Sequence, residues 1–130
     1  GSDYSPYLDG KAPPPADAAL LACYQPFGQY TREQGGREYR GVRTLRYTYV
    51  RDLRGPWLLY DNEQDPCQLQ NLVPSEEYAG LRVELDGKLN ALLAQYDDNF
   101  LPGKELFYFP WTWRGFTGPY GKLRKRTKRT

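Results

Sequence analysis

A stripe of apolar side chains in the second half of the chain constrains the fold more than any other feature. Between residues 78 and 96, apolar residues recur at steps of three and four positions. They are Tyr78, Leu81, Leu85, Leu89, Leu92, Leu93 and Tyr96. This spacing places them on one face of an α-helix. Ser75 stands where an N-cap belongs, and Glu76 and Glu77 favour the positive end of the helix dipole. The sequence therefore predicts one long amphipathic helix.

The residues before this helix have the pattern of an antiparallel sheet. Residues 41–51 alternate apolar and polar side chains with a break near Leu45-Arg46, which predicts two strands joined by a tight turn. Gly55-Pro56 predicts a second turn, and residues 57–60 a third strand. Residues 19–24 form a continuous apolar run, which is typical of a strand buried on both faces. The expected fold class is α+β, with a small antiparallel β-sheet of three to four strands packed with one long C-terminal amphipathic helix.

The composition divides the chain into three parts. Residues 1–17 hold Gly1-Ser2, which looks like a cloning scar, and an extended linker with three successive prolines. Residues 18–106 contain the predicted sheet and helix and form the folded unit. Residues 107–130 are an aromatic, proline-interrupted segment followed by a basic tail.

The basic tail accounts for the positive net charge. The chain has 18 basic and 16 acidic residues, a net charge of +2. Six of the basic residues fall within the last nine positions, which leaves the rest of the chain at 12 basic against 16 acidic, a net charge of −4. The six are Lys122, Arg124, Lys125, Arg126, Lys128 and Arg129. Such a tail suits a polyanion such as a sulfated polysaccharide, or nucleic acid bound without sequence preference, or is a solvated end.

The two cysteines and the hydropathy pattern give only weak information about the cellular environment of the protein. Cys23 and Cys67 permit one disulfide, but the sequence favours two separate thiols. No apolar run approaches the ~20 residues that a membrane-spanning helix needs, so no membrane association is expected.

Two stretches resemble the C-terminal subdomain of type I sulfatases, which belong to the alkaline phosphatase superfamily. The first is EYRGVRTLRYTYVRDLRGPW at residues 38–57, and the second is WLLYDNEQDPCQLQNL at residues 57–72. The residue types in the second stretch favour structural roles: Tyr60 packs and hydrogen-bonds at a strand end, Asp65-Pro66 fixes a turn, Leu69 and Leu72 fill the gap between loop and helix, and Asn71 caps a turn. FLPGKE at residues 100–105 also fits the family.

The resemblance implies that the chemistry lies elsewhere. A parent sulfatase would be expected to use calcium and a formylglycine made from Cys or Ser in a Cys/Ser-x-Pro-x-Arg motif. Neither Cys23 nor Cys67 stands in such a motif, and the chain has no histidine for acid–base catalysis. We therefore expect no catalytic residue, no metal site and no cofactor in this chain, and a missing catalytic domain of the same protein as its partner. The acid pairs Glu76-Glu77 and Asp97-Asp98 are expected to be solvated.

The same resemblance places several residues at the rim of the parent's substrate cleft. The candidates for contact with a sulfated substrate are Gln29, Tyr30, Arg32, Tyr39, Arg40 and Arg43. Guanidinium groups suit sulfate because their donors form a planar fork. The alternative is that Arg40 and Arg43 form ion pairs with Glu38 or Asp52 across the sheet.

Other interpretations stay open at this stage. The chain is either the accessory domain of a sulfatase, the same subdomain of a phosphodiesterase or phosphonate hydrolase, or a stand-alone module that binds carbohydrate or a polyanion. In isolation the strand at residues 19–24 would leave an exposed edge and apolar face, so the chain is expected to self-associate or to bury that strand in a different position from that in the parent. Family resemblance favours a periplasmic or secreted bacterial enzyme, with a cytoplasmic location as the alternative.

Overall fold

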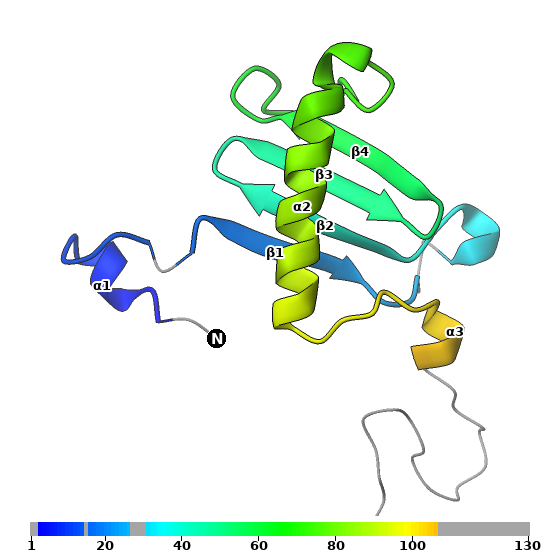
Figure 1. Ribbon diagram of the computed structural model, residues 1–130, viewed down its shortest axis with the longest axis horizontal. Coiled ribbons are helices and arrows are strands. Elements are labelled where there is room, and N and C mark those ends of the chain that lie inside the picture. The colour runs from blue at the N-terminus through cyan, green and yellow to red at the C-terminus, as the bar shows by residue number, and fades with distance from the viewer. Residues whose placement is uncertain (1–2, 15, 27–30, 107–130) are drawn as a thin grey trace, which may run out of the picture.

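The core of the structure is a four-stranded antiparallel sheet with one long helix across it. The computed structural model describes residues 3–14, 16–26 and 31–106. The sheet has the order β1-β2-β3-β4, so each strand pairs with its neighbour in sequence. The strands are β1 (Ala18–Cys23), β2 (Tyr39–Thr44), β3 (Tyr47–Asp52) and β4 (Gly55–Asp61). Helix α2 (Ala79–Gln95) runs across one face of the sheet, as Figure 1 shows. The predicted α+β fold class is confirmed.

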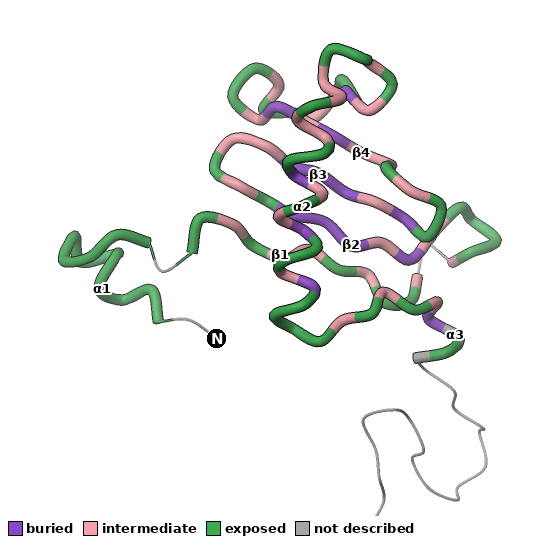
Figure 2. Tube along the Cα trace, in the orientation of Figure 1, coloured by how far each residue is buried: buried purple, intermediate pink, exposed green. Residues whose placement is uncertain are grey.

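The strand register gives each face of the sheet its own row of side chains. Leu20, Val42, Tyr49 and Leu59 are successive partners across the four strands. They pack with α2, because Val42, Tyr49 and Leu59 belong to the same buried cluster as Leu85, Leu89 and Leu93. Figure 2 marks the buried positions along β2, β3 and β4 and along α2, which crosses these strands.

Helix α2 confirms the predicted apolar stripe, with one change at each end. Leu85, Leu89 and Leu93 are buried, whereas Tyr96 lies beyond the helix and is exposed. The helix does not begin at Ser75: a 3-10 turn, η3 (Glu76–Tyr78), precedes it, and the Ser75 side chain makes no capping hydrogen bond.

The turns of the sheet agree with the sequence at one place and not at another. A two-residue turn at Leu45-Arg46 joins β2 to β3, as predicted. The predicted turn at Gly55-Pro56 is wrong, because both residues lie in β4 and the turn is made by Leu53-Arg54. Proline is tolerated there because β4 is an edge strand, and an edge strand needs fewer ladder hydrogen bonds.

The run at residues 19–24 forms the opposite edge strand and is not buried on both faces. In β1, Leu20 packs toward the core, whereas Ala19 and Ala22 are exposed. A continuous apolar run does not reveal which of its residues face a core, because alanine is compatible with either environment.

Three short helices complete the described residues: α1 (Ser5–Leu8), η2 (Arg32–Gln34) and α3 (Gly103–Leu106). Residues 107–130, including the predicted basic tail, lie outside the described residues. In the part that the structure describes, no helix is long and apolar enough to cross a membrane.

Candidate functional site

Charged and aromatic side chains gather where β1 and β3 end and β2 and β4 begin. We call this the loop end of the sheet. It holds Arg32, Tyr39 and Arg40 of the predicted rim residues, whereas Arg43 lies toward the opposite end of β2. Gln29 and Tyr30 lie outside the described residues. The structure therefore brings three of the six candidates to one end of the sheet.

Arg40 is fully enclosed at the loop end. Its Nε donates to Oδ2 of Asp98 over 2.5 Å, and its Nη1 donates to the carbonyl oxygens of Cys23 and Tyr39 over 3.1 and 2.9 Å. The guanidinium carbon lies 3.9 Å from the ring centre of Tyr24. The ion-pair partner of Arg40 is Asp98, and not Glu38 or Asp52 as in the alternative interpretation of the sequence. In this chain, Arg40 joins β1 and β2 to the residues that follow α2.

Asp98 has the electrostatics of a structural carboxylate. Burial alone would raise its pKa, but the hydrogen bonds from Arg40 and from the backbone N–H of Phe100 outweigh that cost and hold the pKa below its usual value. The prediction that Asp98 is solvated is wrong, since its side chain is 6% exposed. A carboxylate just after a helix C-terminus is repelled by the negative end of the helix dipole, so a cation is needed nearby. The position of Asp98 after the predicted helix was therefore the signal in the sequence that a cation lies opposite it.

Glu38 fastens the chain that follows α2 to the start of β2. Its Oε1 accepts a hydrogen bond of 2.8 Å from the backbone N–H of Gly103 and one from Arg32. Burial opposes ionisation, but these donors lower the pKa of Glu38. A Cβ atom on Gly103 would lie 2.4 Å from the carbonyl oxygen of Tyr24, so the chain passes too closely for any side chain there. Arg32 remains 46% exposed.

Asp52 orients two further arginines that the sequence did not single out. It accepts hydrogen bonds from Arg37 Nη1 over 2.9 Å and from Arg54 Nη2 over 3.2 Å. Its side chain is buried, at 8% exposed. The desolvation of Asp52 is outweighed by these bonds and by the N–H of Arg54, so its pKa is lowered. Arg37 also lies over the Trp57 ring, 4.3 Å from its centre. Arg54 is 77% exposed, so the loop end presents guanidinium donors to its surroundings.

Arg43 is exposed and turns to polar neighbours on its own face. Its Nη1 donates to Oγ1 of Thr48 over 2.6 Å, and the same oxygen also contacts Gln68 Nε2 at 3.2 Å. The alternative ion pairs of Arg43 with Glu38 or Asp52 are not formed, because Arg43 lies opposite Thr48, at the other end of the β2–β3 pair from both carboxylates. Those carboxylates bind Arg32, Arg37 and Arg54 instead.

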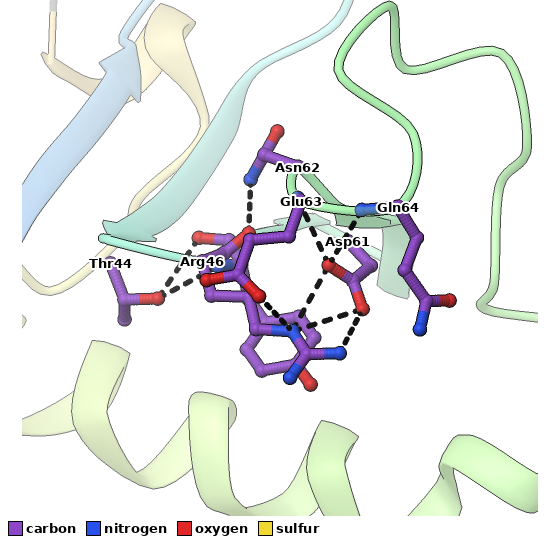
Figure 3. Close-up of polar contacts among 7 residues, drawn as sticks. Thr44, Arg46, Asp61, Asn62, Glu63 and Gln64 are labelled. Carbon is purple, nitrogen blue, oxygen red and sulfur yellow. Dashed lines mark hydrogen bonds and ion pairs between the residues drawn. The ribbon is translucent and has the colours of Figure 1, made fainter.

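Motif residues at the end of β4 and just after it form a polar cluster around the β2–β3 turn, shown in Figure 3. Arg46 donates to Asp61 through Nε and Nη2, the latter over 2.6 Å, and also pairs with Glu63. The hydrogen bond from Arg46 is the main cause of the lowered pKa of Asp61. The backbone carbonyl of Arg46 accepts from the N–H of Asn62 over 2.8 Å. The cluster ties the β2–β3 turn to the end of β4.

The loop that leads to α2 closes the outer edge of β4. Asn71 accepts from the N–H of Leu59 over 3.0 Å and donates to the carbonyl of Trp57 over 3.0 Å. Asp65 accepts from the N–H of Gln70 over 2.7 Å, as expected of its turn. Leu72 enters the core, but Leu69 does not fill the loop–helix gap as predicted: it is 86% exposed.

The described residues contain no group of three or more His, Cys, Asp or Glu side chains that could hold a metal ion. Cys23 and Cys67 are free thiols, which agrees with the preferred interpretation of the sequence; Cys23 is partly buried, whereas Cys67 is exposed. No protein-family model matches the chain.

Two curated relatives match most of the chain. An ulvan-active sulfatase from Formosa agariphila is 39% identical over 101 residues, which cover 77% of this chain and 19% of that protein. An N-acetylglucosamine-6-O-sulfatase from Bacteroides thetaiotaomicron is 29% identical over 111 residues, 84% of this chain and 20% of that protein. The chain spans about a fifth of the length of each relative.

Solved structures give the same picture. A protein in complex with its substrate, D-glucosamine-2-N,6-O-disulfate, is similar with a TM-score of 0.63 and 27% identity, over 76% of this chain and 20% of that one. Phosphonate monoester hydrolase of Agrobacterium radiobacter is similar with a TM-score of 0.58 and 28% identity, over 74% of this chain and 21% of that one.

Proposed function

Because the chain is homologous to sulfatases over about three-quarters of its length and has the fold expected of their C-terminal subdomain, we propose that it is the accessory part of a sulfatase-type hydrolase. Its role is to support a catalytic domain and to form part of the rim of the substrate cleft. The chain by itself is catalytically incomplete.

The observation that carries this proposal is the ratio of the two coverages. The match takes in 77% of this chain but 19% of the ulvan-active sulfatase, so about four-fifths of that relative has no counterpart here. Residues of the two sequence motifs make structural contacts: Arg46 binds Asp61, and Asn71 binds the backbone of β4 at Leu59. Such contacts stabilise an accessory domain and leave the chemistry to the rest of the protein.

The calcium and formylglycine of the parent family do not fit this chain. Cys23 is followed by Tyr-Gln-Pro-Phe and Cys67 by Gln-Leu-Gln, so neither stands in Cys/Ser-x-Pro-x-Arg. The described carboxylates at the loop end are already bound to arginines. No catalytic step is therefore assigned to residues of this chain, and the reactive centre belongs to the proposed catalytic domain.

For the substrate rim, the loop end offers Arg32, Tyr39 and the pair held by Asp52, Arg37 and Arg54. Asp52 fixes the pair at 2.9 and 3.2 Å, which orients their remaining donors before any ligand arrives. Preoriented guanidinium groups suit a sulfate ester, because two parallel N–H groups match two sulfate oxygens. We assign a sulfated saccharide as the ligand class. Arg40 serves here as a positioning residue, since it is enclosed.

Two experiments test the proposal. The reading frame that encodes this chain is expected to contain a Cys/Ser-x-Pro-x-Arg motif upstream, and a frame without one would refute the sulfatase assignment.

In the whole protein, Arg54→Ala should raise KM for a sulfated saccharide about tenfold, because a hydrogen bond to a charged group contributes about 1.5 kcal/mol or more. Lys88→Ala on α2 is the matched control, since it removes a partly exposed cation from another surface. Unchanged KM in Arg54→Ala would remove this pair from the rim.

A phosphonate or phosphodiester hydrolase is the second candidate. It is favoured by the similarity to the Agrobacterium radiobacter enzyme. That enzyme is 28% identical to this chain, and the protein bound to D-glucosamine-2-N,6-O-disulfate is 27% identical, so identity does not separate the two. Parallel assays of the whole protein with an aryl sulfate and an aryl phosphonate separate the two.

The third candidate, a stand-alone polyanion-binding module, predicts that heparin binding depends on the six basic residues of the tail.

A further inference from the structure

The face of the sheet opposite α2, here called the helix-free face, carries a second apolar row. Leu21, Gly41, Val50 and Leu58 are successive partners across the four strands. They point away from α2, because side chains alternate along a strand and their neighbours in sequence face the helix. Val50 is 5% exposed, yet it is not part of the core cluster around α2.

The apolar surface continues from this row toward the loop end, where the rings of Tyr39 and Trp57 lie 5.9 Å apart. Toward the hairpin end, Tyr60 stands opposite Thr48, whose hydroxyl is bound by Arg43 and Gln68, so the apolar surface ends there. Leu21, Tyr39, Trp57, Leu58 and Tyr60 are all partly buried. Among the described strand residues, the charged side chains of this face are Arg43 and Asp52, at opposite ends.

This pattern is not that of a sheet with one solvated face. An antiparallel sheet that faces water on one side alternates apolar residues with polar ones. Here both central rows are apolar, while α2 covers one of them. In the described part of the chain, the sheet therefore has an apolar layer that its own long helix does not cover.

We infer that the helix-free face is the surface on which the catalytic part of a longer sulfatase-type chain docks. The inference rests on the proposed function and adds which surface is used. Its occupant follows from length: the relatives are about five times as long as the stretch that they share with this chain. The absence of charge along the central row suits an apolar partner surface in a permanent contact. Residues 107–130 and a second copy of the chain are the competing occupants.

The test measures the accessibility of cysteines placed on the two sides of the sheet. In a background with Cys23→Ser and Cys67→Ser, Leu58→Cys reports the helix-free face and Val83→Cys reports α2, where Val83 is 75% exposed. Tyr60→Cys is a second reporter for the helix-free face. Maleimide labelling rates are compared between the 130-residue chain alone and the whole protein encoded by the gene.

The expected result is that Leu58→Cys and Tyr60→Cys label readily in the chain alone and at least about tenfold more slowly in the whole protein, where the contact must open first. Val83→Cys should label equally fast in both. Equal rates for Leu58→Cys in the two proteins overturn the inference, as does slower labelling of Val83→Cys alone. Protection of Leu58→Cys already in the chain alone also overturns it; protection lost on dilution then identifies a second copy, and protection that persists identifies residues 107–130.

Failure of the proposed function is a separate result. A gene that encodes no catalytic part overturns the proposed function, and this inference with it, before any labelling is done. The labelling outcomes overturn the docking surface alone.

Discussion

The guanidinium group of Arg40 and the carboxylate of Asp98 form a buried ion pair with an Nε–Oδ2 distance of 2.5 Å, although 58 positions separate them in sequence. The pair holds the residues that follow α2 against the first two strands. It closes the fold at the loop end, next to the candidate rim residues.

Removal of Arg40 should destabilise the chain strongly. Arg40→Ala leaves Asp98 buried without a cation, and breaking a buried pair in this way costs about 3 kcal/mol or more. Arg43→Ala, on the same strand but exposed, should cost about 0.5 kcal/mol or less. Urea unfolding followed by circular dichroism measures both. Equal losses of unfolding free energy in the two variants would show that the Arg40–Asp98 pair does not hold the loop end closed.

Stability should fall in acid because three carboxylates at the loop end have a lowered pKa, as does Asp61 at the end of β4. Asp98, Glu38 and Asp52 each have a folded-state pKa below the ordinary value. A lowered folded pKa gives stability that is present above the unfolded pKa, near pH 4, and lost as the pH falls toward the folded pKa. The free energy of unfolding should therefore decline from about pH 5 downward, and the decline should be shallower in Asp98→Asn. A flat profile between pH 5 and 2 would contradict these contacts.

Tyr49 predicts a second loss of stability in base. Burial, and secondarily the charge of Asp86, raises its pKa above the ordinary value of 10.0. Its contribution is complete below the unfolded pKa and is lost as the pH rises above about 10, because the unfolded chain then releases the proton first. Tyr49→Phe removes this dependence. Thermal unfolding of both proteins between pH 8 and about 11 measures it, and identical profiles would contradict the assignment.

Two glycines should respond in opposite directions to alanine. Gly103→Ala places a Cβ 2.4 Å from the backbone oxygen of Tyr24 and should destabilise by about 1–3 kcal/mol. Gly80→Ala meets no atom within 4 Å and lies in α2, so it should stabilise by up to about 1 kcal/mol. Chemical denaturation of both variants tests the close approach at the loop end. Stabilisation by Gly103→Ala would rule that approach out.

Two leucines of one motif should also differ. Leu72 is 9% exposed within the core cluster, so Leu72→Ala should cost about 2–5 kcal/mol. Leu69 is 86% exposed, and Leu69→Ala should stay within about 0.5 kcal/mol in the chain alone. A large loss for Leu69→Ala would mean that its loop lies differently.

The sequence predicted those elements whose signal is local. The apolar stripe at residues 78–96 predicted α2, since steps of three and four residues bring side chains to one face of a helix. The break in alternation at Leu45-Arg46 predicted the first hairpin turn. Gly55-Pro56 misled because a Gly-Pro pair is typical of turns yet also fits the start of an edge strand.

The contacts at the candidate site were beyond the sequence because they join distant residues. Asp98 looked like a solvated acid until the fold placed Arg40 opposite it, and Glu38 binds Gly103 across 65 positions. Leu69 and Leu72 have the same chemistry, and only the path of the loop decides which enters the core.

Sulfate release tests the central claim most directly. An aryl sulfate is incubated with the 130-residue chain alone and with the whole protein that the gene encodes, at equal molar concentration. The account predicts sulfate release by the whole protein and a rate with the chain alone that equals the buffer blank. Release by the chain alone, or its absence in a folded whole protein that hydrolyses a phosphonate instead, would contradict the assignment of this chain as the accessory part of a sulfatase.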